Sequence, residues 1–182
     1  MLGGLDSIDW DSLQDAYGSA RNVPDHLRAL LSNDDAIRAK ALDQLFSTVY
    51  HQGTIYSASA HVVPFLVELL EAPEVQDKPC ILLLLAGIAG GRGYYEVHDP
   101  RVQRSEEMKV VAAVRRTAAP HIPALLSHLV HPEPEVRIAV AEALPFYPEH
   151  NALSSETLQR ARDSESNPEV LDVFSEVLTQ LH

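Results

Sequence analysis

This chain of 182 residues has little cysteine, little positive charge and no long apolar run. Cys80 is its single cysteine, so an internal disulfide is excluded and the cytoplasm is the expected compartment. The longest apolar run, Cys80–Ala89, is too short to cross a bilayer and predicts a buried helix instead. Met1 opens no basic-then-apolar signal stretch, so we expect neither export nor a membrane partner.

Lysine and arginine together number 14 against 26 aspartates and glutamates, which gives a formal net charge of −12. Proteins that bind DNA or RNA draw much of their affinity from basic side chains, so this balance argues against a nucleic-acid partner. A basic protein partner would instead be attracted to the chain. Surplus acid also serves solubility alone, and both interpretations stay open at this point.

What the sequence does contain is a pair of apolar stripes separated by a proline turn. Apolar residues spaced three and four apart over Ile122–Leu129 predict one face of a helix. The turn His131–Glu133 ends that helix, because proline supplies no backbone N–H and clashes with the preceding turn. A second stripe follows over Val136–Leu144. Two helices this short cannot bury both stripes alone, so they require similar pairs to pack against.

Copies of this pattern recur along the chain with a period of about forty residues, built from helix pairs. A poorer last copy begins at Asn167–Val170. The period predicts an all-α fold, an α-solenoid in which each pair contacts mainly its neighbours. The matching first-helix positions are Pro24, Leu27 and Leu30; Pro64, Val67 and Leu70; and Pro123, Leu126 and Leu129.

Two turns carry a resemblance to a known family. Ala36–Arg38 and Glu135–Arg137 resemble the HEAT-repeat signature, and His51–Tyr56 followed by Val63–Leu66 is similar to small bacterial HEAT-repeat (armadillo-like) proteins. The resemblance implies one HEAT-repeat domain over residues 1–182, a HEAT-like solenoid of about four helix pairs with an insertion at about 90–118. The second copy departs from the pattern by carrying Lys78 in place of arginine.

The sequence also predicts details of the array. Asp9–Tyr17 should form a short N-terminal capping helix that ends at Gly18 and lays Trp10 over the first repeat. Arg38 and Arg137 occupy equivalent positions, where we expect an ion pair or carbonyl contact between repeats. Asp34 or Asp35 and, in the next repeat, Asp77 are expected N-caps.

The connection His51–Tyr56 is longer than a plain repeat requires, and Gly53 permits unusual backbone angles within it. Its side chains His51, Gln52 and Tyr56 are candidates for partner binding. An alternative stays open, in which these side chains satisfy carbonyl groups at a helix end.

Gly90–Ser105 interrupts the repeat. Glycines and the Asp99–Pro100 step predict an extended loop, and Glu106–Ala119 predicts an added helix. Basic residues outnumber acidic ones from Arg92 to Arg116, and tyrosines are favoured at binding hot spots. A disordered surface excursion is the competing interpretation. The candidate partner-binding residues of the loop are Arg92, Tyr94, Tyr95, Arg101 and Arg104.

No residue pattern indicates catalysis. His121, His128 and His131 can approach one helical side, but no HExxH motif accompanies them. Gly90–Gly93 lacks the Lys-Ser/Thr of a phosphate loop and follows a helix. We therefore predict no catalytic residue, no metal ligand and no cofactor.

The sequence and the resemblance together imply a non-catalytic module that binds a protein partner, most naturally a basic one. Within bacterial HEAT-like families, one such role is an immunity protein that neutralises a basic toxin. The alternative is a HEAT-like enzyme, such as a relative of bilin lyases or DNA glycosylases. A glycosylase would require a basic groove, which this composition disfavours.

Overall fold

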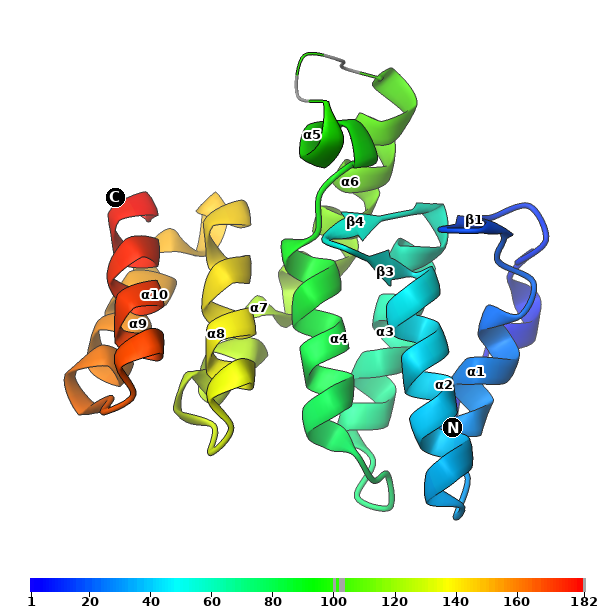
Figure 1. Cartoon of the computed structure of the whole chain (residues 1–182), viewed down its shortest axis with the longest axis horizontal. Coiled ribbons are helices and arrows are strands. Elements are labelled where there is room, and N and C mark those ends of the chain that lie inside the picture. Colours follow the sequence, from blue (N-terminus) through cyan, green and yellow to red (C-terminus); the bar gives the residue numbers. More distant parts are fainter. Residues whose placement is uncertain (100, 102–103, 182) are drawn as a thin grey trace.

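The computed structural model describes residues 1–99, 101 and 104–181, and it is mostly helical (Figure 1). The all-α prediction is confirmed, and no helix in the described ranges is long and apolar enough to cross a membrane. The α-helices are α1 Val23–Ala29, α2 Asp35–Thr48, α3 Ser57–Glu71, α4 Lys78–Gly90, α5 Tyr94–His98, α6 Ser105–Ala118, α7 Ile122–Leu125, α8 Pro134–Ala143, α9 Asn151–Ser164 and α10 Pro168–Gln180. Two hairpins accompany them: β1 Gln14–Asp15 with β2 Gly18–Ser19 before α1, and β3 Tyr50–His51 with β4 Thr54–Ile55 between α2 and α3.

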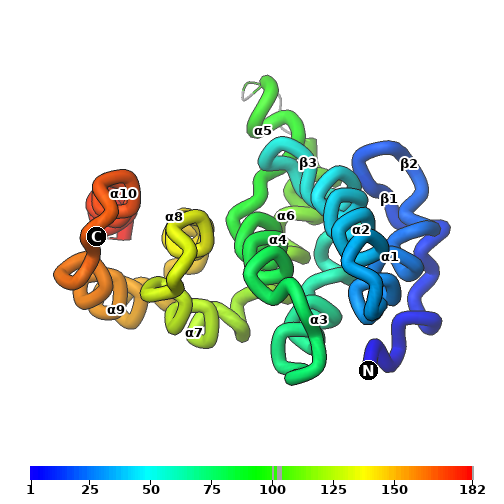
Figure 2. Tube along the Cα trace, turned by 60° about the horizontal axis from the view of Figure 1, so that its bottom comes forward, coloured from blue at the N-terminus to red at the C-terminus, as the bar shows by residue number. Residues whose placement is uncertain are grey.

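Consecutive helices pack in pairs, and the pairs follow one another along the molecule. α1 packs on α2, α3 on α4, and α9 on α10. Between pairs, α4 packs on α8 and α8 on α10. Figure 2 shows α2, α4, α8 and α10 in one row, with α3, α7 and α9 in a second row and α1 beside α2.

The first helix of the third pair is longer than the sequence indicates. α6 runs through a 3₁₀ turn at Ala119–His121 into α7, and a further 3₁₀ turn, Leu126–Val130, completes the run. Pro120 and Pro123 lie within it and remove backbone donors, which explains the change from α to 3₁₀ hydrogen bonding. α6 corresponds to the predicted added helix. It packs on α3 and α4 and leads into α7, so it connects the second helix pair to the third.

The apolar stripes form the core, as their spacing predicts. Leu129 is 1% exposed and Leu42 is 7% exposed. Leu27, Leu45 and Leu66 are completely enclosed. Most of the favourable free energy of folding therefore comes from apolar area buried between helices of neighbouring pairs.

The predicted N-terminal capping helix at Asp9–Tyr17 is wrong. A 3₁₀ turn at Leu5–Ser7 precedes the β1–β2 hairpin, in which Gly18 has a φ of 132°. Ser12 donates to the carbonyl of Asp9 and Asp15 accepts from the amide of Tyr17, so short polar side chains stabilise turns in place of a helix. A helix this short would also be marginal by itself.

Trp10 is buried, as expected for a packing residue, but its ring contacts lie on α3 of the second pair and not on the first repeat. It is 5% exposed, its indole N–H donates to the Leu5 carbonyl over 2.8 Å, and its ring lies near those of His61 and Phe65.

Arg38 makes the expected contact between pairs. Its Nε donates to the Asp77 carboxylate over 2.5 Å, and its Nη1 donates to the Ser32 carbonyl in the turn of its own pair. Asp34 caps α2 as predicted, accepting from the amide of Ala36. Asp77 precedes α4 with a φ of 53° but makes no capping hydrogen bond, since its carboxylate faces Arg38.

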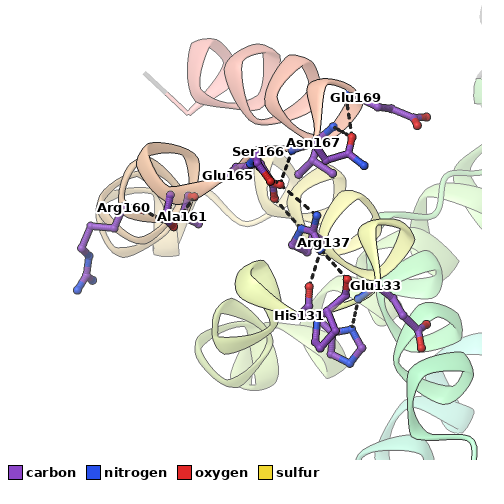
Figure 3. Close-up of polar contacts among 12 residues, drawn as sticks. His131, Glu133, Arg137, Arg160, Ala161, Glu165, Ser166, Asn167 and Glu169 are labelled. Atoms are coloured by element: carbon purple, nitrogen blue, oxygen red, sulfur yellow. Dashed lines mark hydrogen bonds and ion pairs between the residues drawn. The ribbon is translucent and has the colours of Figure 1, made fainter.

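Arg137, on the second helix of the third pair, repeats the arrangement (Figure 3). Its Nε and Nη2 donate to the two carboxylate oxygens of Glu165, over 2.7 and 3.2 Å, and its Nη1 donates to the carbonyls of His131 and Pro132. In both places an arginine donates to a carbonyl in the turn of its own helix pair and to an acidic side chain in the turn of the next helix pair. Lys78 retains only the carbonyl contact, to Leu70.

Candidate functional site

The structure brings together two stretches that the sequence predicts separately as binding segments. Gln52 and Gly53 form the β3–β4 turn with φ values of 50° and 84°, which is the conformation of a tight two-residue hairpin. Thr54 forms a parallel bridge with Arg92. The amide of Arg92 donates to the Gly53 carbonyl over 2.9 Å, and the amide of Ile55 donates to the Arg92 carbonyl over 3.0 Å. The start of the insertion is therefore joined to the hairpin by a single parallel bridge at Arg92.

The hairpin residues do not satisfy the end of α2, which was the alternative explanation for them. The Thr48 carbonyl accepts from the amide of Ala16, and the Val49 carbonyl accepts from the Ser59 hydroxyl. Within the described chain, no side chain of His51, Gln52 or Tyr56 donates a hydrogen bond to a carbonyl of α2. These side chains are left available to solvent or to a partner.

The two hairpins and α5 lie at the same end of the helices (Figure 1). Aromatic and imidazole rings from these segments contact one another there. The ring of Tyr17 lies 5.7 Å from that of His51, and the ring of Tyr94 lies 4.4 Å from that of His98. Partial burial, with Tyr17, Tyr94 and Asp15 nearby, raises the pKa of Tyr56. We call Tyr17, His51, Tyr56, Tyr94 and His98 the hairpin edge.

Two of the aromatic side chains of the hairpin edge are largely open to solvent. Tyr17 is 72% exposed and Tyr94 is 50% exposed. The sequence predicts Tyr17 as part of a helix packed on the first repeat, so its exposure was missed. Large exposed aromatic side chains that lie together are typical of protein-binding surfaces.

The predicted extended loop at Gly90–Ser105 is wrong in part, because α5 forms within it. The amide of Tyr95 donates to Glu107 on α6, and a side chain at Gly93 would overlap Glu107. The Arg104 guanidinium lies 4.3 Å above the Tyr95 ring. Pro100, part of the predicted loop, lies outside the described residues.

Arg101 is the candidate least engaged with the fold. It is 95% exposed and lies 3.5 Å from the Asp99 carboxylate, an ion pair too exposed to hold its position firmly. The structure therefore unites His51, Gln52, Tyr56, Arg92 and Tyr94 around the hairpins. The ring of Tyr95 lies 5.3 Å from that of Tyr94 and carries Arg104 over its face, while Arg101 faces Asp99.

A groove of about 380 Å³ begins beside the hairpin and runs across α4, α8 and α10. We call it the central groove. Tyr50, Gly53 and Arg92 line the end next to the hairpin, so a predicted candidate residue lies at its mouth. The other lining residues are Ala86, Gly87, Gly90, Ala139, Glu142, Ala143, Phe146, Val173, Glu176, Val177 and Gln180.

Small residues make the floor of the central groove. A methyl group at Gly87 would lie 2.8 Å from the Tyr50 ring, and one at Gly90 would lie 3.4 Å from the Cα of Ala143. α4 therefore approaches α8 closely, and Tyr50 rests directly on α4. The depth of the groove depends on residues that the sequence presents only as part of an apolar helix.

Two carboxylates lie along the far wall, Glu142 on α8 and Glu176 on α10. Partial burial in the groove, together with Glu176, raises the pKa of Glu142. Burial and the nearby Glu142 also raise the pKa of Tyr50, while Arg92 acts in the opposite direction. Sequence reasoning missed these acids because each falls on an exposed helical position that resembles ordinary solvated surface.

The histidines form no evident metal centre. The rings of His128 and His131 lie 6.1 Å apart. In the described ranges, no group of three or more His, Cys, Asp or Glu side chains is placed to hold a metal ion.

Comparison with family models finds no match to this chain, and comparison with curated proteins finds none either.

Proposed function

We propose that this protein is a HEAT-like α-solenoid that binds a protein partner and has no catalytic activity of its own. The paired helices and the repeated arginine contacts support the solenoid. Arg38 and Arg137 each bind a carbonyl of their own turn and an acid of the next, as repeats that stack in register would require.

The observation that carries the binding function is the hairpin edge. Five aromatic or imidazole side chains from three separate segments meet there, and Tyr17 and Tyr94 are largely exposed. Packing within the chain does not account for leaving two tyrosines open to water. A partner that covers them would gain buried apolar area as well as hydrogen bonds from the phenol groups.

The partner we propose is a basic protein. The net charge of −12 would speed the approach of such a protein, while the contact itself forms on the aromatic rings. A basic bacterial toxin is a partner of this kind, and the chain would then act as its immunity protein.

A pull-down from the source cell with quantitative mass spectrometry tests the proposal. The bait is the wild-type chain, the Tyr17→Ser/Tyr94→Ser variant, or a control Val130→Ser/Leu153→Ser variant that changes two exposed apolar residues elsewhere. We expect one stoichiometric basic protein with the wild type and the control, and at least about tenfold less of it with the hairpin-edge variant. Equal capture by all three baits would contradict the role of the edge.

A further inference from the structure

The central groove is a second surface feature that side chains of the chain itself do not fill. Its floor is kept low by Gly87 and Gly90, and its walls carry the aromatic rings of Tyr50 and Phe146. It is therefore a shaped surface, with room for about 380 Å³ of a ligand.

The two carboxylates of the groove, Glu142 and Glu176, have few partners within the chain. Within the part of the chain that the structure describes, the Glu142 carboxylate makes no ion pair and accepts no side-chain hydrogen bond. Glu176 accepts only a long bond, 3.4 Å from the amide of Gln180. Arg92 lines the mouth of the groove, but no ion pair joins it to either carboxylate in the described chain. The two carboxylates therefore repel each other, and a cation placed between them would relieve that repulsion.

Aromatic walls restrict the kind of cation that would fit. A guanidinium is planar, stacks on aromatic faces and can donate to two carboxylates at once, whereas an ammonium is compact and strongly hydrated.

We propose that the central groove binds an arginine side chain of the protein partner, with Glu142 and Glu176 as its carboxylate ligands and Tyr50 and Phe146 beside it. The proposal rests on the protein-binding function inferred above, and it adds a second contact surface next to the hairpin edge. Arg92, at the mouth of the groove, lies between the two surfaces.

The test uses the full chain and a defined probe, a capped peptide of alternating glycine and arginine. Its dissociation constant is measured at physiological ionic strength, where long-range attraction is largely screened. The groove variant is Glu142→Gln/Glu176→Gln. The control, Glu135→Gln/Asp172→Asn, removes the same charge from exposed positions on the same two helices outside the groove.

We expect the groove variant to bind the arginine peptide at least about tenfold more weakly than wild type, and the control to lose less than about threefold. A lysine peptide of the same length should bind more weakly to the wild type than the arginine peptide does. In a titration followed by nuclear magnetic resonance, the amides of Gly87 and Gly90 should shift, and that of Gly18 should not.

Absence of measurable binding to the wild type would overturn the proposal, and so would equal weakening by the groove and control variants, which would show diffuse attraction to an acidic surface. The peptide measurement is independent of the pull-down. A partner that depends on Tyr17 and Tyr94, combined with a groove that fails this test, would therefore refute the groove alone.

Discussion

The Arg115 guanidinium donates to the Gly91 carbonyl, with 2.6 Å between Nη2 and the oxygen, and also to the Ala89 carbonyl. A helix from the insertion thus closes the C-terminal end of α4. No carboxylate in the described chain pairs with Arg115, and burial lowers its pKa. The carbonyl dipoles and the face of Phe146, 4.2 Å away, stabilise the charge instead.

The contact of Arg115 with the end of α4 holds the hairpin edge and the central groove in place. Gly91 lies directly before Arg92, whose backbone pairs with the β3–β4 hairpin. Tyr147 adds a hydrogen bond to Ala89 over 3.0 Å, and burial raises its pKa to about 12, so it remains a donor at every physiological pH.

Replacing Arg115 should therefore destabilise the whole chain. We expect Arg115→Met to lower the free energy of unfolding by about 2–3 kcal/mol, since it removes the side-chain donor to the Gly91 carbonyl and one of the two side-chain donors to the Ala89 carbonyl. Urea denaturation measures the change. The adjacent Arg116 is exposed, and Arg116→Met should stay within about 0.5 kcal/mol of wild type. Equal effects at the two positions would refute the role assigned to Arg115.

The Arg137–Glu165 ion pair predicts a dependence of stability on pH. Burial would raise the pKa of Glu165, but hydrogen bonds from the amides of Asn167 and Ser166 and from Arg137 outweigh it and lower that pKa. A carboxyl whose folded pKa is lowered stabilises the fold above its unfolded pKa, and that stability is lost as pH falls through the folded value.

Glu165→Gln should accordingly be less stable than wild type at neutral pH, and the two proteins should converge below the pH at which folded Glu165 protonates. Thermal unfolding of both, from about pH 7 to about pH 3, measures the gap. Carboxyls common to the two proteins cancel in the comparison. A gap that persists unchanged in acid would show that ionisation of Glu165 is not what stabilises the turn.

Glu142 should behave in the opposite way. Its folded pKa is raised, so the charged form is disfavoured in the fold and stability falls as pH rises from the unfolded toward the folded pKa. We expect Glu142→Gln to raise the midpoint of thermal unfolding at neutral pH, and the gain to vanish in acid. A lower midpoint for this variant at neutral pH would mean that the carboxylate has a stabilising contact within the chain.

The apolar stripes give the prediction that tests the helix pairs themselves. Leu129→Ala and Leu42→Ala should each lower the free energy of unfolding by about 2–5 kcal/mol, because both side chains fill space between helices. Leu153 is 43% exposed, and Leu153→Ala should cost much less. Denaturant titration of the three variants decides whether the buried stripes have been assigned correctly.

Gly91 is expected to be intolerant of any side chain. A methyl group there would lie 2.3 Å from Cγ2 of Ile55, so Gly91→Ala should displace the hairpin from α4 and cost about 1–3 kcal/mol. Gly3 has open space around it, and Gly3→Ala serves as the control. If both alanine variants unfold at the wild-type denaturant concentration, the hairpin does not rest on α4 as described.

The sequence by itself determined most of the helices, their buried faces and the arginine contacts between turns, although it predicted a helix at Asp9–Tyr17 that does not form and missed α5. The correct predictions follow from local spacing, since residues three and four apart share a helical face, and similar turn residues occur in the first and third copies. His51, Gln52, Arg92 and Tyr94 could also be selected from sequence, because glycine-containing connections mark places where a chain leaves its repeat.

Only the tertiary structure decided how those segments meet. The pairing of Thr54 with Arg92, the closure of α4 by Arg115 and the wall formed by Glu142 and Glu176 all join residues distant in the chain. The groove wall depends on the distance between α4 and α8, which is short because Gly90 of α4 lies against Ala143 of α8 and neither residue has a large side chain. No local periodicity records such distances, and so the central groove became visible only once the helices were in place.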